Sequence, residues 1–302
     1  TAERQPPAPD RGAAIAVIRQ GALRGPTYGE SAYKLYEACA PGQRDERPVL
    51  VLWLHGADMG DIPAADLLRM HGQLGRRACF LVPLNPTGAA GLRFQWAIGY
   101  TKAQNRNDLG FIFGELHAPY LQDVCKLVRS AARAVDAAQV WAMGYSMGGF
   151  GVYQIVSCQP EIFDVAVVVA GYGLGTLEPA HLGYYAPQPE AGQVFADFLD
   201  RHAARLARGP VLLAVHARRD ATSSFRDAGA IVERVARAGG HAELVAVPDE
   251  FADSDPGRKG ALGAPVLRLR AAGGHEPRGR VRPRRAGPRA LRSARRAAPW
   301  RA

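Results

Sequence analysis

The residues from Gly144 to Gly148 place a serine, Ser146, between two glycines, in the order Gly-Tyr-Ser-Met-Gly. A serine hydroxyl becomes a nucleophile when it projects from a sharp turn and has a base within reach. Glycines on both sides permit such a turn, because side chains there would collide with the neighbouring strand and helix. The pattern predicts Ser146 as a nucleophile, with Gly144 and Gly148 as the glycines of its turn.

The residues around this pentapeptide have the pattern of a strand followed by a helix. Residues 139–143 form a short apolar run that is typical of a buried strand, and residues 150–156 are expected to be helical. A strand, a tight turn and a helix are the setting that a catalytic Gly-x-Ser-x-Gly motif requires. The alternative is a glycine-rich turn that carries an inert serine.

Further apolar runs alternate along the chain with segments of helical spacing. The runs cover residues 49–54, 79–84, 165–170, 211–216 and 243–247. The helical segments cover residues 64–77, 120–135, 194–206 and 223–238. Runs that are apolar throughout are typical of parallel strands covered on both faces. This alternation predicts an α/β fold, in which a mostly parallel central sheet has helices on both faces.

The chain resembles the α/β-hydrolase superfamily. The segments 144–149 and 54–56 carry the resemblance, which covers residues 25–275. Within this superfamily, these segments are most similar to carboxylesterases of the feruloyl-esterase and polyhydroxybutyrate-depolymerase type. The resemblance implies an oxyanion hole formed by the backbone N–H groups of Ala57 and Met147. Two fixed N–H groups stabilise a tetrahedral intermediate without having to reorganise.

In this superfamily the acid and the base follow the nucleophile in the order Ser, Asp or Glu, His. Residues 216–220 read His-Ala-Arg-Arg-Asp, where esterases of this type carry His-Gly-x-x-Asp. Asp220 is therefore the expected acid, which orients the imidazole and stabilises its charged form. Asp227, inside the next predicted helix, is the second candidate. The alternative for Asp220 is a capping role at the start of that helix.

His275 is the histidine that follows the last of these runs, and it is the expected base. It comes after residues 266–270, which could form a returning strand, and two glycines, so a flexible loop would deliver it to the edge of the sheet. The alternative is an inert loop histidine. Related hydrolases continue here with an amphipathic helix, whereas this chain changes to an arginine-rich segment. The change indicates either a native tail or an altered reading frame.

Other polar and aromatic residues near these segments have simpler interpretations. Trp96 and Tyr145 are candidates for a substrate-binding wall, with core packing as the alternative. His55 is expected to hold its loop by side-chain hydrogen bonds. Asp58 and Asp61 lack a third oxygen ligand in register, so no metal site is expected. No phosphate cradle or nucleotide fingerprint is present, and the chemistry needs water rather than a cofactor.

The composition of the 302 residues, 47% apolar and 22% charged, is typical of a globular enzyme. No apolar run approaches the roughly 18 residues of a membrane span. Of the net charge of +10, residues 276–302 carry +9, because they contain ten arginines and one glutamate. We expect a disordered lead-in over residues 1–12, a hydrolase domain over 13–275 and a disordered tail over 276–302.

The predicted function is that of a serine esterase that cleaves a small-molecule ester through an acyl-enzyme. One alternative is a serine peptidase of the prolyl-oligopeptidase type. Another is a binding protein on a hydrolase scaffold that uses its basic tail. The tail arginines lack interleaved aromatic residues, so no specific nucleic-acid partner is expected. Cys79 and Cys125 lie in apolar stretches, where buried thiols are expected, and this favours a reducing compartment such as the cytoplasm, with secretion after removal of an N-terminal segment as the alternative.

Overall fold

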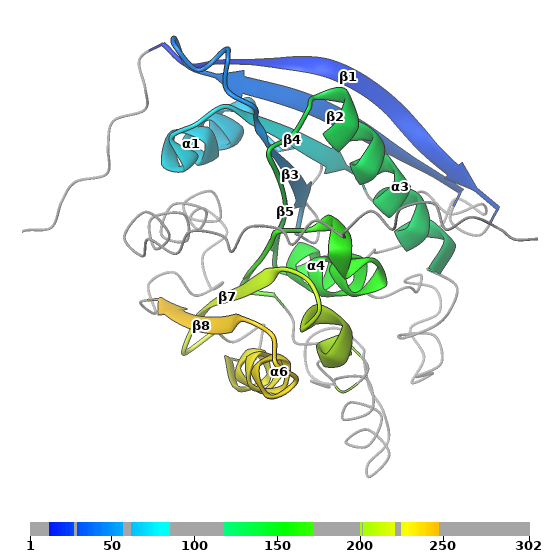
Figure 1. Ribbon diagram of the computed structural model, residues 1–302, viewed down its shortest axis with the longest axis vertical. Helices are drawn as coiled ribbons and strands as arrows, with labels where there is room; N and C mark the ends of the chain where they lie inside the picture. Colours follow the sequence, from blue (N-terminus) through cyan, green and yellow to red (C-terminus); the bar gives the residue numbers. More distant parts are fainter. Residues whose placement is uncertain are drawn as a thin grey trace, which may run out of the picture.

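The computed structural model describes residues 12–26, 29–56, 62–84, 118–171, 200, 202–220 and 225–247 of the chain. Within these residues one sheet has the strand order β1-β2-β4-β3-β5-β6-β7-β8 (Figure 1). The strands are β1 (Ala14–Gly25), β2 (Gly29–Cys39), β3 (Val49–Leu54), β4 (Ala78–Pro83), β5 (Gln139–Tyr145), β6 (Val165–Val169), β7 (Val211–Ala217) and β8 (Ala242–Val247). The helices are α1 (Ala64–Leu74), α3 (Ala118–Ala134), α4 (Met147–Cys158), the short 3-10 helix η3 (Pro160–Ile162) and α6 (Phe225–Arg237). Residues 202–206 are also helical.

The strands from β4 to β8 in this order are all parallel. Every residue of β3, β4 and β6 is buried, which explains their uninterrupted apolar sequences. The six runs predicted as strands agree with these six parallel strands to within two residues at each end. The prediction of a mostly parallel sheet is therefore confirmed.

Helices cover both faces of the sheet, and each face has its own apolar cluster. Side chains of α3, α4, α6 and residues 202–206 form one cluster with one face. Leu67 and Met70 of α1 belong to the cluster on the other face. Figure 1 shows α1 and α3 on opposite sides of the upper strands. The predicted layering is confirmed for the described helices.

The antiparallel strands β1 and β2 have no counterpart among the predicted strands. In β2 the buried positions, such as Ser31, Tyr33 and Leu35, alternate with more exposed ones. One face of β2 is closer to solvent, so β2 has no continuous apolar run. β1 does begin with the apolar residues 14–18, but no position of this strand is fully buried, and the run was not among the predicted strands. In β1, Val17 and Ile18 are 48% and 46% exposed. The register of β1 on β2 also shifts between Val17 and Arg19.

The strand order creates a switch point between β3 and β5. From β3 the chain passes through α1 to β4 on one side, whereas from β5 it passes through α4 to β6 on the other side. In parallel α/β sheets, ligands bind beyond the carboxyl ends of the strands at such a point. His55 directly follows β3 and Ser146 directly follows β5, so both residues lie there.

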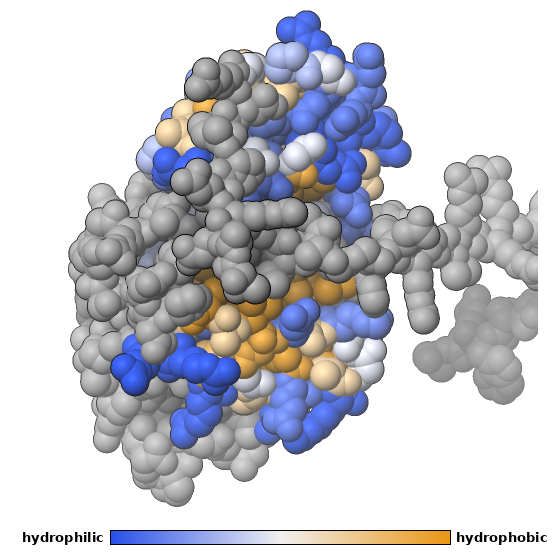
Figure 2. Space-filling model, turned by 90° about the vertical axis from the view of Figure 1, so that its left-hand side faces the viewer, coloured by the Kyte–Doolittle hydropathy of each residue, from blue (hydrophilic) through white to orange (hydrophobic). Residues whose placement is uncertain are grey.

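The face of the molecule in Figure 2 has hydrophilic residues above and below a central group of apolar residues. Among the described residues, no helix has the length and apolar character that crossing a membrane requires. The predicted tail and nearly all of the predicted lead-in lie outside the described residues, so the domain limits stay predictions.

Candidate functional site

Ser146 has a backbone conformation that is costly for any residue with a side chain. Its φ is 54° and its ψ is −118°, close to the first central position of a type II′ turn, where glycine is usual. The Ser146 N–H donates to the Val169 carbonyl at 2.8 Å, and the Ser146 carbonyl accepts from the Gly149 N–H at 2.9 Å. These bonds to β6 and α4 hold the serine in its conformation. Strained backbone of this kind is concentrated at functional sites.

The glycines on either side of Ser146 are required by close contacts between backbone segments. A Cβ at Gly144 would lie 2.2 Å from the Gly148 carbonyl oxygen. A Cβ at Gly148 would lie 2.0 Å from the Leu54 carbonyl oxygen and 2.7 Å from that of His55. The turn after β5 therefore packs directly on the end of β3, and only glycine allows this approach.

Ser146 differs from the expectation in one respect, because it is 5% exposed. The tight turn was expected to leave the hydroxyl accessible, but the turn lies below the surrounding surface. Tyr145, before it, is 4% exposed and belongs to the apolar cluster on the α1 face. Its position matches the core-packing alternative, and its role in substrate binding stays a prediction. Trp96 lies outside the described residues.

The loop after β3 begins with a short hydrogen bond. His55 is 2% exposed, and its Nδ1 lies 2.7 Å from the Gly56 carbonyl oxygen. A carbonyl oxygen only accepts, so Nδ1 is the protonated nitrogen of this ring. The contact is the loop-holding hydrogen bond that was expected of His55. Ala57, the expected oxyanion donor, is outside the described residues.

Met147 is the first residue of α4. The first four N–H groups of a helix have no carbonyl partner within the helix, and the helix dipole favours negative charge there. The Met147 N–H is therefore placed where an anion would be stabilised, immediately after Ser146. Its side chain is not among those described.

Asp220 lies just beyond β7, and its side chain is fully buried. Its Oδ2 is 3.4 Å from Nε2 of His216, whose side chain is 1% exposed. The edge of the Phe225 ring approaches the His216 ring with 6.1 Å between centroids, and Arg218 stacks over Phe225 at 5.1 Å. A buried carboxylate needs polar partners, and the His216 ring lies close to Oδ2, although their contact does not have the geometry of a hydrogen bond.

The contact between His216 and Asp220 was not predicted, although both residues were noted. Its signal in the sequence is a histidine in a strand followed four residues later by an aspartate in a turn. Asp227 lies in the first turn of α6, as expected, and is 8% exposed.

Ser146 and Asp220 lie at the same edge of the sheet. Strands β5, β6 and β7 are adjacent and parallel, with Tyr145, Val169 and Val215 aligned across them. Two strand spacings separate the ends of β5 and β7, which is roughly 10 Å. An imidazole between the two side chains would span a gap of this size.

The other described histidines have locations that do not suit a base at this edge. His71 pairs with Gln43 at 2.9 Å, and His202 pairs with Ser157 at 2.5 Å. His241 directly precedes β8, so it lies at the amino edge of the parallel strands. His275 is outside the described residues. The described residues also contain no cluster of three or more side chains suited to a metal ion.

Comparisons with known proteins agree with this architecture. A family model described as the prolyl oligopeptidase family matches residues 119–251. A thermostable esterase is similar in structure at 18% identity and a TM-score of 0.50, over 77% of this chain and 55% of that one. The S-formylglutathione hydrolase of Staphylococcus aureus is similar at 16% identity and a TM-score of 0.54, over 86% and 97% of the two chains. No curated protein sequence matches the chain.

A peptidase is also among the similar structures. The puromycin-hydrolyzing peptidase of Mycobacterium tuberculosis is 16% identical, with a TM-score of 0.53, over 82% of this chain and 38% of that one. The chain thus spans nearly all of the S-formylglutathione hydrolase, about half of the thermostable esterase and less than half of the peptidase. The likeness to the feruloyl-esterase and polyhydroxybutyrate-depolymerase type stays a prediction. The sheet, its helices and these neighbours show that the chain has an α/β-hydrolase fold, which esterases and peptidases share.

Proposed function

We propose that this chain is a serine esterase that hydrolyses small carboxylic esters through an acyl-enzyme on Ser146. The observation that carries the proposal is the strained backbone of Ser146 between two glycines that tolerate no side chain. Such a turn costs stability, and a glycine would adopt the same conformation without that cost. A role for the hydroxyl explains why a serine occupies this conformation.

In the proposed reaction, His275 takes the proton of Ser146 Oγ while that oxygen attacks the ester carbonyl carbon. The N–H groups of Ala57 and Met147 stabilise the negative oxygen of the tetrahedral intermediate. His275 then returns the proton to the departing alcohol, which leaves the acyl group on Ser146. A water molecule, activated in the same way, releases the acid. Asp220 orients the imidazole and stabilises its charged form.

Labelling with a fluorophosphonate tests the nucleophile without assuming a substrate. We expect one label per chain on the peptide that contains Ser146, and none in Ser146→Ala. The matched control is Ser157→Ala, which removes a buried hydroxyl from the far end of the same helix. Labelling that persists in folded Ser146→Ala would contradict the proposal, as would folded wild-type protein that takes no label.

The base is tested separately, because His275 is outside the described residues. His275→Ala should lower kcat for p-nitrophenyl acetate by about 10²- to 10⁴-fold, the usual contribution of a general base. His241→Ala is the control, since it removes an exposed histidine from the opposite edge of the sheet. Equal activities in these two variants would exclude His275.

A peptidase is the second candidate function, because of the prolyl oligopeptidase family match and the similar peptidase structure. The two functions differ in the leaving group, an alcohol or an amine. Proline-containing p-nitroanilides should be assayed beside p-nitrophenyl esters at equal concentration. A higher kcat/KM for the anilides, lost in Ser146→Ala, would favour the peptidase over the esterase.

A further inference from the structure

Two cysteines that are far apart in the sequence meet between α3 and α4. Cys125 is a buried residue of α3, and Cys158 is the last residue of α4 and partly exposed. Cys125 Sγ lies 3.7 Å from the Ile155 carbonyl oxygen. In a helix this carbonyl points toward the C-terminal end, so the Cys125 sulfur lies beside the last turn of α4, where Cys158 is. The two thiols are hydrogen bonded to each other.

The two sulfurs differ in acidity, and the cause is their mutual contact. The hydrogen bond from Cys125 lowers the pKa of Cys158 to about 7, although partial burial acts in the opposite direction. The same bond, together with burial, raises the pKa of Cys125. The proton therefore stays on Cys125, and Cys158 is the thiol of the pair that ionises first. Cys125 has one thiol proton to donate. When Cys158 is a thiolate, that proton points to the Cys158 sulfur rather than to the Ile155 carbonyl oxygen.

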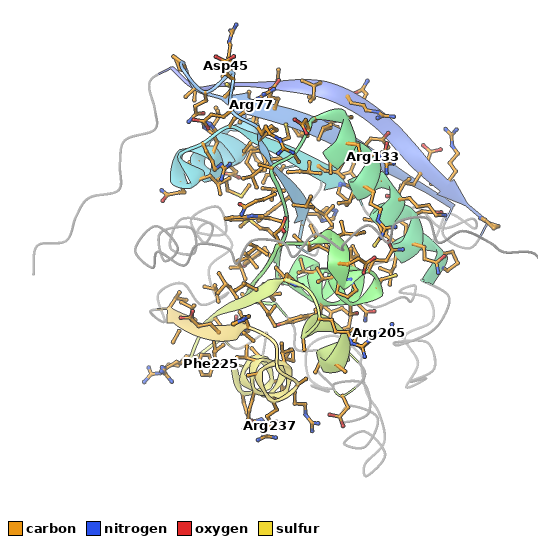
Figure 3. All side chains as sticks on the ribbon, in the orientation of Figure 1. Asp45, Arg77, Arg133, Arg205, Phe225 and Arg237 are labelled. Atoms are coloured by element: carbon orange, nitrogen blue, oxygen red, sulfur yellow. The ribbon has the colours of Figure 1, made fainter. Side chains whose placement is uncertain are left out.

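The charged groups around the pair come from three elements. Arg205, labelled in Figure 3, belongs to the helical residues 202–206 and favours the Cys158 thiolate. Glu161 of η3 opposes it, but Arg129 of α3 pairs with Glu161 at 2.6 Å and also favours a thiolate at Cys125. The charge of Glu161 is thus partly offset, and the site favours a negative sulfur.

We propose that Cys125 and Cys158 are a modification site at which a peroxide converts two thiols into a disulfide joining α3 to α4. Cys158 attacks one oxygen of hydrogen peroxide, the O–O bond breaks, and the departing hydroxide takes a proton from solvent to become water. Cys158 is then a sulfenic acid. The Cys125 sulfur attacks the Cys158 sulfur, the S–O bond breaks, and the hydroxide leaves as water with the proton of Cys125. Two electrons pass from the thiols to one peroxide.

The other two cysteines provide an internal comparison. Burial raises the pKa of Cys79 to about 12, and its side chain is inaccessible within β4. Cys39, at the end of β2, donates to the Ala40 carbonyl at 3.4 Å. Neither has a thiol partner in a hydrogen bond that the described residues show. We expect both to react more slowly than Cys158, because neither belongs to a hydrogen-bonded thiol pair within the described residues.

The experiment uses the full chain, first reduced and then treated with a small molar excess of hydrogen peroxide at pH 7. Peptide mapping without reductant should find Cys125 joined to Cys158, with the loss of two hydrogens. The oxidised protein should melt higher, by on the order of 5 °C, and return to the original melting temperature on reduction. Cys39→Ser is the matched control and should form the same disulfide.

Two variants separate the steps. Cys125→Ala should stop at the sulfenic acid, detected as a dimedone adduct on Cys158, and its alkylation by iodoacetamide should need a higher pH than in wild type. Cys158→Ser should yield neither product. Wild-type mapping needs no variant to fold, so it decides the proposal: a sulfenic acid on Cys158 without a disulfide would overturn it, and so would faster oxidation of Cys39.

Discussion

The turn that follows β5 is shaped by backbone contacts, whereas the turn that follows β7 is shaped by side chains. After β5, glycines bring Ser146 and the end of β3 together without any side chain between them. After β7, Asp220 lies against His216, the His216 ring meets Phe225, and Arg218 stacks on Phe225. The backbone-built turn fixes one atom rigidly and accepts almost no substitution. The side-chain-built turn should lose its contacts one at a time.

The largest effect is expected at Gly148. In Gly148→Ala the new Cβ would meet the Leu54 carbonyl oxygen at 2.0 Å, and two backbone segments would have to move apart. We expect the free energy of unfolding to fall by at least about 3 kcal/mol, as in severe overpacking. Urea unfolding measures it. Gly72→Ala in α1 is the control, because nothing lies within 4 Å of its new Cβ. There alanine should stabilise the helix by about 0.5–1 kcal/mol.

Loss of the His216 contact should have the next largest effect. His216→Ala leaves the buried Asp220 carboxylate with one partner fewer, which should lower the free energy of unfolding by about 2–3 kcal/mol. His216→Gln keeps a donor and should recover part of this loss. Denaturant unfolding of both variants measures whether His216→Gln is more stable than His216→Ala. If alanine and glutamine were equally stable, packing rather than the polar contact would hold the turn.

The backbone strain at Ser146 should make the glycine variant of this residue more stable than the alanine variant, by less than the two effects above. Ser146→Ala and Ser146→Gly both remove the hydroxyl, but only glycine adopts a φ of 54° without steric cost. We expect the glycine variant to be more stable than the alanine variant by about 1 kcal/mol, after allowing for the greater entropy of the unfolded glycine chain. Thermal unfolding of the pair measures this difference. Equal melting temperatures would mean that the turn relaxes once the hydroxyl is absent.

The smallest effect is expected at Arg218. Arg218 is exposed and stacks on Phe225, so Arg218→Ala should cost about 0.5 kcal/mol. Urea unfolding at low and high salt checks it. An effect as large as that of His216→Ala would show that the turn after β7 responds as a unit, and the contrast with the turn after β5 would be lost.

These elements also show what the sequence could reveal. The parallel strands were predictable because burial on both faces forces continuous apolar runs, and Ser146 because its turn requires glycines at fixed spacing. The strand β2 was missed because its buried positions alternate with more exposed ones, and β1 because its apolar residues 14–18 lead into the polar residues Arg19 and Gln20. The contact between Cys125 and Cys158 depends on how α3 packs on α4, and no local sequence pattern indicates how these helices pack. The contact of Asp220 with His216 could not be predicted, because it depends on how the chain turns after β7.

The bulge in β1, the outermost described strand, affects whether this edge of the sheet can pair with a strand of another chain. Ile18 is the extra residue between Val17, opposite Tyr36, and Arg19, opposite Leu35. Such a bulge bends and twists an edge, so its free amides and carbonyls do not form the straight row that another chain could extend. Deleting Ile18 would restore a regular ladder without changing the face of any side chain, because Val17 opposite Tyr36 and Arg19 opposite Leu35 already alternate between the two faces. The bulge at Ile18 thus makes β1 a poorer template for strand pairing with another chain than a straight edge would be.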